Sequence, residues 1–243
     1  MNNLQFTIYK KIKYPLFIVY CLLFLSTHSV LAQSVDLLWQ AQTYTPPFYE
    51  GKALWSKQSV IRLVAIPQGL GTPSNLIYKW IRNDTVLGNI SGVGKNTLTY
   101  VDSILSRPQT FEVQILSSDD SVLARDSVSL APRDPSIAVY ENNPLYGFLF
   151  HREVGGEYDL REKEVSFGAF PYFFSVANRV NNQANYEWRV NNGSAQLGAS
   201  VTYRAPEDNS GSSIVSIKAS HVQDIVQEVK KDFLVKFGEN NAQ

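Results

Sequence analysis

Two stretches, YKWIRND at residues 78–84 and YEWRVNNG at residues 186–193, share a pattern in which Tyr-x-Trp leads into Asn. Large and charged side chains alternate in both, so Tyr78 and Trp80 share one face while Lys79 points away. Alternation with period two is typical of a β-strand with one buried face. The pattern therefore predicts one Trp-bearing, half-buried strand in each half of the chain.

Other landmarks recur in the same order around these strands. Val60–Pro67 is matched by Glu164–Pro171, and YTPPFYEG at 44–51 is matched by YENNPLYG at 140–147. After each Trp come a Thr-Tyr pair, an alternating apolar strand, a polar loop and a last strand. Because these segments alternate with period two, two copies of one β-unit explain the matches better than chance.

The segment APRDP at 131–135 separates the two copies. Its two prolines lack the backbone N–H that a sheet requires and favour an extended linker. We therefore expect one β-sandwich domain at residues 33–133, a second at 134–238 and a polar tail at 239–243. The linker is too short for free tumbling, so the two domains should touch.

Residues 1–32 have the order of a secretory signal peptide. Three lysines come first, the apolar run Tyr14–Leu25 follows, and Val30 and Ala32 supply the small residues that cleavage requires. The run is short for a membrane span, which needs about 20 residues. We expect a secreted, periplasmic or cell-surface protein with no membrane span after cleavage; an uncleaved signal anchor is the alternative.

The composition after cleavage excludes some classes of function. Met1 and Cys21 are the only Met and Cys in the chain, so no disulfide or catalytic thiolate is expected beyond residue 32. Removing residues 1–32 takes three lysines from 22 basic residues and nothing from 22 acidic ones, which leaves a net charge of about minus three. Nucleic acid is not an expected partner, because no basic stripe remains to neutralise phosphates.

The strands resemble an immunoglobulin-like or PKD-like sandwich, in which a Trp of the third strand packs across the core. PKD repeats carry W-x-F-G-D-G at the end of that strand; Trp80–Asp84 and Trp188–Gly193 lack the Gly before the acid. YTPPFYEGKAL, PLYG and FPYFFS also resemble uncharacterised secreted two-domain proteins of candidate-phylum bacteria, a family with no established activity. The resemblance implies an all-β fold of two tandem immunoglobulin-like (PKD-like) β-sandwiches, with Trp80 and Trp188 as the structural core.

Two segments, FPYFF at 170–174 and YTPPFY at 44–49, are rich in aromatic side chains. If Phe173 faces the core with Phe167, alternation turns the neighbouring rings to the opposite face. Either the neighbouring domain or the Tyr140–Phe150 segment covers these rings, or they form an open surface for a protein or a glycan. The candidate binding surface consists of Phe170, Tyr172, Phe174, Tyr44, Phe48 and Tyr49.

No motif favours catalysis, and we expect a non-enzymatic protein without a metal or cofactor. Gly88–Thr97 departs from a phosphate loop because Asn96, and not Ser or Thr, follows Lys95, so we interpret it as a flexible hairpin loop. His151 and His221 lack zinc-site spacing and are expected at the surface. A hydrolase is disfavoured because no nucleophile, metal cluster or motif-spaced carboxylate pair stands out.

One segment is ambiguous in its secondary structure. Between His221 and Phe233 the apolar residues recur at spacings of three and four, which is typical of an amphipathic helix. The first copy has only a plain turn at Asp119–Asp120 in the equivalent place. We therefore favour a long hairpin over a helix.

These features favour an exported, non-enzymatic interaction or structural module of the cell envelope or surface. Its partner would be an unknown envelope protein. The alternative is a carbohydrate-binding module that uses the exposed aromatic rings, with a glycan as ligand.

Overall fold

The structure is a computed structural model that describes residues 32–101, 103–180, 182–207 and 210–238. The expected signal peptide, except for Ala32, and the expected tail at 239–243 lie outside these residues. The all-β prediction is confirmed, because two short 3₁₀ turns, η1 (Pro73–Asn75) and η2 (Gly88–Ile90), are the only helical elements in the described ranges. No helix in this part of the chain is long and apolar enough to cross a membrane.

The first eight strands form two sheets that face each other. One sheet has the order β1-β2-β6, the other has the order β4-β3-β7-β8, and β5 pairs with β3. All pairs in these sheets are antiparallel. The strands are β1 (Ser34–Ala41), β2 (Val60–Gln68), β3 (Ile77–Arg82), β4 (Thr85–Val86), β5 (Gly92–Val93), β6 (Thr97–Val101), β7 (Gln109–Leu116) and β8 (Val122–Leu130).

The last nine strands form a second pair of sheets, with the orders β10-β9-β12-β15 and β11-β17-β16-β13-β14. The short β11 pairs in parallel with β17, and the other pairs are antiparallel. The strands are β9 (Ser136–Asn143), β10 (Gly147–Glu153), β11 (Glu157–Asp159), β12 (Glu164–Tyr172), β13 (Ala184–Val190), β14 (Gln196–Leu197), β15 (Ser200–Arg204), β16 (Gly211–His221) and β17 (Glu228–Phe237).

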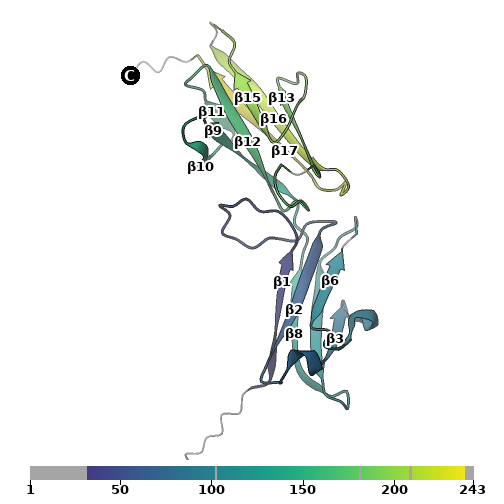
Figure 1. Cartoon of the computed structure of the whole chain (residues 1–243). Helices are drawn as coiled ribbons and strands as arrows, with labels where there is room; N and C mark the ends of the chain where they lie inside the picture. Colours follow the sequence, from purple (N-terminus) through teal and green to yellow (C-terminus); the bar gives the residue numbers. More distant parts are fainter. Residues whose placement is uncertain (1–31, 102, 181, 208–209, 239–243) are drawn as a thin grey trace, which may run out of the picture.

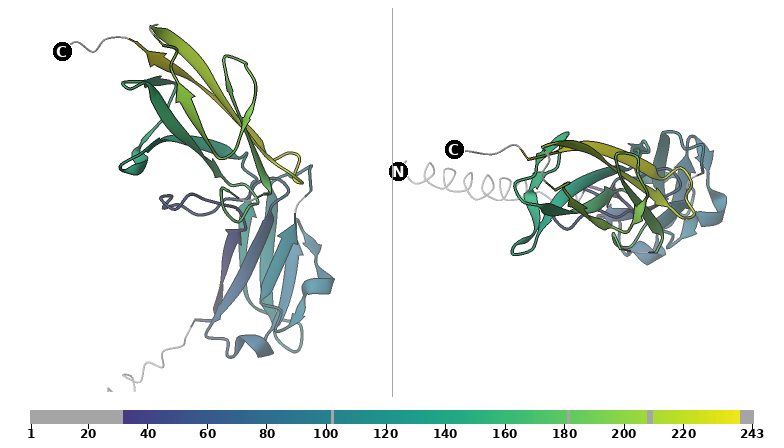
Figure 2. Two further views of the ribbon diagram at one scale, coloured as in Figure 1. Left: turned by 45° about the horizontal axis from the view of Figure 1, so that its top comes forward. Right: turned by 90° about the horizontal axis from the view of Figure 1, so that it is seen from above.

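The two sandwiches lie end to end in an elongated molecule (Figures 1 and 2). In the described residues, no sheet mixes strands from the two halves. In each sandwich the Trp-bearing strand pairs with the long strand that precedes the last one, the strand order of immunoglobulin-like domains.

Each sandwich has its own apolar core, which includes the Trp of its Tyr-x-Trp strand; the first core also buries Trp55, which is 1% exposed. Trp80 is 0% exposed and Trp188 is 1% exposed. The first core includes Leu37, Ile61, Leu63, Tyr78, Phe111, Val113 and Ile115. The second core includes Val139, Phe167, Tyr186, Val215, Ile217 and Val235.

The indole N–H of each core Trp is satisfied in the same way. Trp80 Nε1 donates to the carbonyl oxygen of Lys95 at 2.7 Å, and Trp188 Nε1 donates to that of Gly198 at 2.9 Å. A buried polar group needs such a partner, because leaving it unpaired costs about 1 to 3 kcal/mol. The loop predicted from Gly88–Thr97 therefore holds an acceptor for the core; it contains η2 and β5.

The Asn that ends each Trp-bearing stretch has a structural role. Asn83 and Asn191 adopt positive φ angles of 45° and 49°, a left-handed conformation that Asn tolerates better than most residues. Their side-chain oxygens accept from the backbone N–H of Thr110 and of Ile214, each at 2.9 Å. The repeated Tyr-x-Trp-x-x-Asn pattern thus combines a core ring with a strand-ending turn.

The ambiguous segment after His221 is a hairpin, which confirms the favoured interpretation. β16 ends at His221, β17 begins at Glu228, and the N–H of Gln227 closes the turn on the carbonyl of Asp224 at 2.8 Å. The expectation that His221 lies at the surface is wrong. It is 6% exposed because its Nδ1 accepts the N–H groups of Gln223 and Asp224 inside the turn.

Candidate functional site

The candidate site lies on the outer face of the β10-β9-β12-β15 sheet. Val165, Phe167 and Ala169 of β12 point into the core, so Phe170 and Tyr172 point outward. On this face Phe170 is 3% exposed and packs with Tyr140 of β9, which is 5% exposed. These rings point away from the core of their own sandwich, so other side chains must bury them.

Part of the cover comes from β10 in the same sandwich. Phe148 meets Phe170 edge to face at 4.9 Å between ring centroids, and Phe150 meets it at 5.3 Å. Gly168 makes this approach possible, since a Cβ there would overlap the Phe148 ring. Edge-to-face pairs are each worth roughly 0.5 to 1.5 kcal/mol beyond their area burial.

The rest of the cover comes from the first sandwich. Residues 42–59, which we call the connecting loop, join β1 to β2 and project beside the second sandwich (Figure 1). Phe48 of this loop lies 4.4 Å from Phe150 and 5.1 Å from Tyr140, measured between centroids. Tyr49 meets Tyr172 edge to face at 5.5 Å. We call the whole group the aromatic joint: Phe48, Tyr49, Tyr140, Phe148, Phe150, Phe170 and Tyr172.

A short antiparallel bridge fixes the root of the connecting loop. The N–H of Tyr44 donates to the carbonyl oxygen of Phe174 at 2.7 Å, and the N–H of Phe173 donates to that of Tyr44 at 2.8 Å. Phe173 has a φ of 63°, which is strained for an aromatic residue and ends the alternation of β12. Phe174 consequently turns into the core.

Buried polar groups add further ties between the sandwiches. Gln227, which is 1% exposed, donates from Nε2 to the carbonyl oxygen of Lys57 at 2.9 Å. The N–H of Val226 donates to Oε1 of Gln58 at 3.1 Å. Removing one partner of a buried hydrogen bond leaves the other partner unsatisfied, which costs free energy of folding. These contacts therefore hold the 221–228 hairpin against the first sandwich.

The linker between the sandwiches is also pinned. Ser56 and Arg133 form a parallel bridge, in which the N–H of Arg133 donates to the carbonyl oxygen of Trp55 at 2.7 Å. Lys57 pairs with Asp134 at 3.4 Å. The two sandwiches touch, as the short linker predicts.

Arg179 lies behind the aromatic joint. Its guanidinium carbon is 4.5 Å from the ring centroid of Phe170 and 4.8 Å from that of Phe148, and Nη1 donates to the carbonyl oxygens of Ala169 and Ala199. Burial lowers the pKa of Arg179, while the nearby Tyr186 and Tyr44 raise it. A cation over two ring faces is an attractive arrangement, so Arg179 supports the joint from inside.

Two tyrosines of the joint, Tyr140 and Tyr172, have a raised pKa. Burial raises the pKa of Tyr172, and the neighbouring Tyr140 and Glu153 raise it further. Burial and Glu153 also raise the pKa of Tyr140, and a hydrogen bond to Tyr172 opposes them. Both hydroxyls therefore stay protonated, and neither is poised as a base near neutral pH.

The predicted candidate residues are only partly brought together. Phe170, Tyr172, Phe48 and Tyr49 meet in the aromatic joint. The prediction that Phe174 shares the outer face is wrong, because Phe174 is 0% exposed in the core, and Tyr44 packs against that core too. Phe170 is covered from both directions that the sequence suggested, by β10 and by the first sandwich.

The match of 44–51 to 140–147 does not hold at the level of structure. Tyr44–Gly51 belongs to the connecting loop, whereas Tyr140–Gly147 spans the end of β9 and the turn into β10. The position equivalent to Tyr140 is Leu38, because β1 and β9 both begin with Ser and then place every second residue in the core of their sandwich. These core residues are Val35 and Leu37 in β1, and Ile137 and Val139 in β9. Sequence reasoning missed Arg179, which contacts rings of the second sandwich, and Gln227, which bonds across to the first. No periodic signal marks either polar group.

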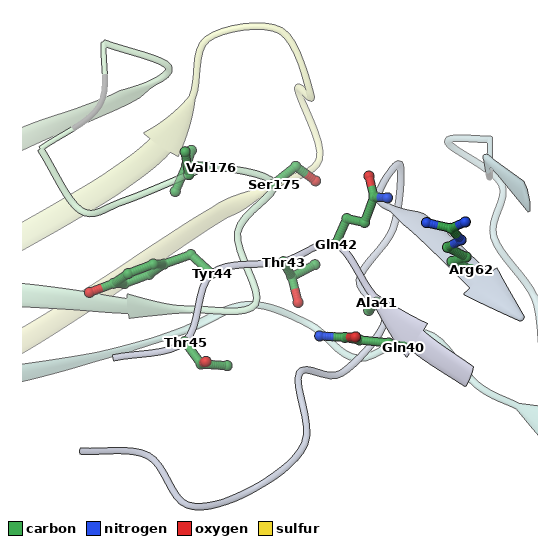
Figure 3. Close-up of a pocket in the computed structure, with 10 residues that line it drawn as sticks. Gln40, Ala41, Gln42, Thr43, Tyr44, Thr45, Arg62, Ser175 and Val176 are labelled. Atoms are coloured by element: carbon green, nitrogen blue, oxygen red, sulfur yellow. The ribbon is translucent and has the colours of Figure 1, made fainter. Parts of the chain in front are cut away.

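A pocket of about 630 Å³ opens where the sandwiches meet (Figure 3). Hydroxyl and amide groups dominate its wall, and Arg62 adds a positive charge at one side, away from the Tyr44 ring. Such a wall can form hydrogen bonds with a small polar molecule but offers no activated nucleophile. The lining residues are Gln40, Ala41, Gln42, Thr43, Tyr44, Thr45, Arg62, Ser175, Val176 and Ala177.

Other candidate chemistry stays dispersed. His151 is exposed on β10, far along the chain from the buried His221. Within the part of the chain that the structure describes, no group of three or more His, Cys, Asp or Glu side chains could hold a metal ion.

Comparisons with known proteins give distant likenesses to tandem β-domains. The fibronectin(III)-like modules of Clostridium thermocellum CbhA have a TM-score of 0.27 at 10% identity, over 82% of this chain and 93% of theirs. The central fibronectin-III array of RIM-binding protein has a TM-score of 0.26 at 13% identity, over 88% and 71%. The two tandem V-type regions of VCBP3, a v-region-containing chitin binding protein, have a TM-score of 0.22 at 8% identity, over 83% and 99%.

All three TM-scores are below 0.5, so the immunoglobulin-like fold rests on the strand order and registers given above. No protein-family model matches the chain, and no curated protein matches it. The resemblance to secreted proteins of candidate-phylum bacteria thus has no sequence match to support it.

Proposed function

We propose that the chain is an exported, non-enzymatic module of the cell envelope or surface, whose two sandwiches act as one firmly joined spacer and interaction unit. The observation that carries this proposal is the aromatic joint. The connecting loop of the first sandwich places Phe48 among Tyr140, Phe150 and Phe170 of the second. A joint of this kind keeps two outer surfaces at a constant separation.

Several features support a mechanical or binding role over a catalytic one. Tyr140 and Tyr172 of the joint stay protonated, and the Arg179 guanidinium is occupied by ring faces and carbonyl oxygens. The order of residues 1–32 supports export, and a chain without disulfides beyond them would depend on its cores and on the joint. In arrays of β-sandwiches, the rigid sheets commonly hold binding loops and edge strands in fixed positions.

The glycan alternative has less support. A platform for sugar stacking needs open ring faces, whereas Phe170 is 3% exposed and Phe48 is half-buried against Tyr140 and Phe150. Tyr172 and Tyr49 are partly exposed but meet each other edge to face. We therefore place the glycan-binding function second.

Cell fractionation with intact-mass measurement tests the export step. The full chain, expressed in a diderm bacterial host, should appear in the periplasm, envelope or medium, with the mass of a chain that begins after Ala32. An unprocessed chain in the cytoplasm would contradict the proposal. Binding on a glycan array that is lost in Tyr172→Ala but kept in Tyr146→Ala would favour the alternative function instead.

A further inference from the structure

His221 is a buried titratable residue outside the aromatic joint. It ends β16 at the turn of the 221–228 hairpin, and its side chain is 2% exposed. Its Nδ1 accepts the N–H of Asp224 at 2.7 Å and that of Gln223 at 3.2 Å. A ring nitrogen that accepts hydrogen bonds carries no proton, so the turn is built around a neutral histidine with its proton on Nε2.

The other ring nitrogen gives the charged form of His221 no support. Nε2 is buried and has no hydrogen-bond partner within the part of the chain that the structure describes. A cationic ring would bury this unpaired N–H donor together with its charge. It would also turn Nδ1 from an acceptor into a second donor that faces two backbone N–H groups. The turn as it stands is therefore compatible with the neutral ring only.

One acceptor for a proton on Nδ1 lies close by. Oδ2 of Asp224 is 3.5 Å from Nδ1 of His221, and the Asp224 side chain is 22% exposed. A protonated ring can therefore exchange its two backbone N–H groups for a carboxylate, which is a strong partner for a cationic donor. This exchange leaves the N–H groups of Gln223 and Asp224 without their acceptor, so the turn must change its conformation.

The same carboxylate connects the histidine to the tie between the sandwiches. Oδ2 of Asp224 accepts from Nε2 of Gln227 at 3.4 Å, and this Nε2 also donates to the carbonyl oxygen of Lys57 in the first sandwich at 2.9 Å. In the same turn, the N–H of Val226 donates to Oε1 of Gln58 at 3.1 Å. A change in the turn thus displaces the groups that hold the first sandwich.

The other titratable groups around the turn are occupied or neutral. The ion pairs that occupy them are Glu228–Lys218 at 2.8 Å and Lys57–Asp134 at 3.4 Å. On the core side, Tyr186 of β13 lies diagonally from His221, because Ala184 pairs with His221 and Tyr186 pairs with Ala219. Burial raises the pKa of Tyr186, so its hydroxyl stays neutral, and the charged group that interacts with it is Arg179. Asp224 is therefore the carboxylate that a protonated ring meets.

The hairpin and the connecting loop hold the sandwiches together at different places. In Figure 1 and in the left view of Figure 2, the yellow-green hairpin and the purple connecting loop lie on opposite sides of the junction. The aromatic joint contains no histidine, so its contacts do not depend on the protonation of His221. Loss of the hairpin tie alone would let the second sandwich tilt about the aromatic joint.

We propose that His221 is an acid-sensitive switch for the tie between the two sandwiches. At neutral pH the neutral ring accepts the two turn N–H groups, and the hairpin holds the first sandwich. When the ring takes up a proton at lower pH, Nδ1–H donates to Asp224, the turn opens and the hairpin tie is lost. Histidine suits this role, because its charge changes between about pH 5 and pH 8. This inference rests on the proposed joined unit and adds a condition that loosens it.

Amide hydrogen exchange, followed by NMR on the purified chain at about pH 7.5 and about pH 5, tests the switch. Protection is corrected for the intrinsic exchange rate at each pH. The protection of the Asp224 and Val226 N–H groups should fall at least about tenfold at the lower pH, whereas that of Ile217 in β16 should not. Small-angle scattering should show a broader distribution of distances between the sandwiches at the lower pH. Unchanged protection would overturn the proposal.

His221→Asn separates the acceptor from the charge. The side-chain oxygen of Asn can accept the same turn N–H groups, as that of Asn143 does in the β9–β10 turn, but it takes up no proton. This variant should keep its protection at both pH values. His151→Asn, at an exposed histidine of β10, is the matched control and should lose protection like the wild type. A loss in His221→Asn equal to that of the wild type would overturn the proposal.

Asp224→Asn gives a test that keeps the histidine. An amide is a weaker acceptor than a carboxylate for a cationic donor, so the protection of the Val226 N–H should be lost at a lower pH than in the wild type. An unchanged pH of half-loss would overturn the proposed exchange of partners. Scattering separates this inference from the proposed function. A broad distribution already at the higher pH would contradict the joined unit on which the switch rests, whereas a narrow distribution with unchanged protection at both pH values would overturn only the switch.

Discussion

The two sandwiches agree inside and differ outside. Both bury one Trp in the same strand, satisfy its indole N–H with a loop carbonyl and end the strand with a left-handed Asn. On the outer face, aliphatic Leu38 and Ile66 stand open in the first sandwich, while aromatic Tyr140 and Phe170 are covered in the second. The comparison teaches that a repeated core fixes the fold, and that the outer residues fix how the units are arranged.

Trp80→Ala and Trp188→Ala test the shared core and should have the largest effect. Removing a fully buried large aromatic costs about 3 to 5 kcal/mol, a large part of a typical domain stability. We expect the two losses to be similar, each confined to one sandwich, as measured by urea unfolding. An unchanged midpoint for either variant would show that the two cores are not equivalent.

Gly168→Val would give the second sandwich the residue type that Val64 provides in the first. Its side chain would overlap the Phe148 ring, so β10 must shift. Overpacking of this kind costs about 1 to 3 kcal/mol, which thermal unfolding can measure. Gly156→Ala is the control, because a Cβ there meets open space; equal losses in both variants would argue against the close Gly168–Phe148 contact.

Phe48→Ala removes the ring that the first sandwich contributes. The ring is half-buried, so we expect a loss of about 1 to 2 kcal/mol, below the cost of a fully buried Phe. Small-angle scattering should show a broader distribution of distances between the sandwiches. Tyr146→Ala is the control within one chain, since its ring is free there and the distribution should stay unchanged.

Alkaline pH should affect the second sandwich more than the first. Burial raises the pKa of four tyrosines in the second sandwich and of Tyr44 and Tyr78 in the first; the four are Tyr140, Tyr158, Tyr172 and Tyr186. An acid whose pKa is raised by folding contributes stability that is complete below its unfolded pKa, about 10 for Tyr, and that is lost as pH rises above this value.

Melting temperatures measured between about pH 9 and pH 11 test this expectation. The transition of the second sandwich should fall more steeply above about pH 10, and Tyr172→Phe should reduce that slope slightly. A slope that is unchanged in Tyr172→Phe and equal in both sandwiches would contradict it.

The sequence pattern predicts most of the fold, because period-two alternation reports which residues share a strand face. The Tyr-x-Trp strands and their partner strands follow from it. The 221–233 hairpin follows instead from the plain turn at Asp119–Asp120 of the first copy, against a local spacing that is typical of a helix. The same reasoning fails at Phe173, where a positive φ reverses the alternation. At His221 the surface expectation came from the absence of zinc-site spacing, whereas alternation with Ile217 and Ala219 places this residue on the buried face. Local pattern carries no information about the backbone conformation of Phe173.

The candidate site was less accessible to sequence reasoning for a related reason. Alternation shows that Phe170 and Tyr172 face outward but not what covers them. The cover comes from Phe48, more than a hundred residues away in the chain, and from Phe148 and Phe150 of β10. Arg179 was missed because its role depends on two ring faces meeting at one place. The sequences of Tyr44–Gly51 and Tyr140–Gly147 resemble each other. Only the structure shows that they occupy different positions in the two sandwiches.

The connecting loop lies early in the chain, and this position affects how the protein folds during synthesis. Phe48 and Tyr49 are synthesised well before the strands that enclose them, so a nascent first sandwich can complete its own core while its loop still lacks a docking surface. Until β9, β10 and β12 emerge, that loop is an apolar segment open to chaperones and proteases. Completion of the second sandwich is thus the step that protects the first.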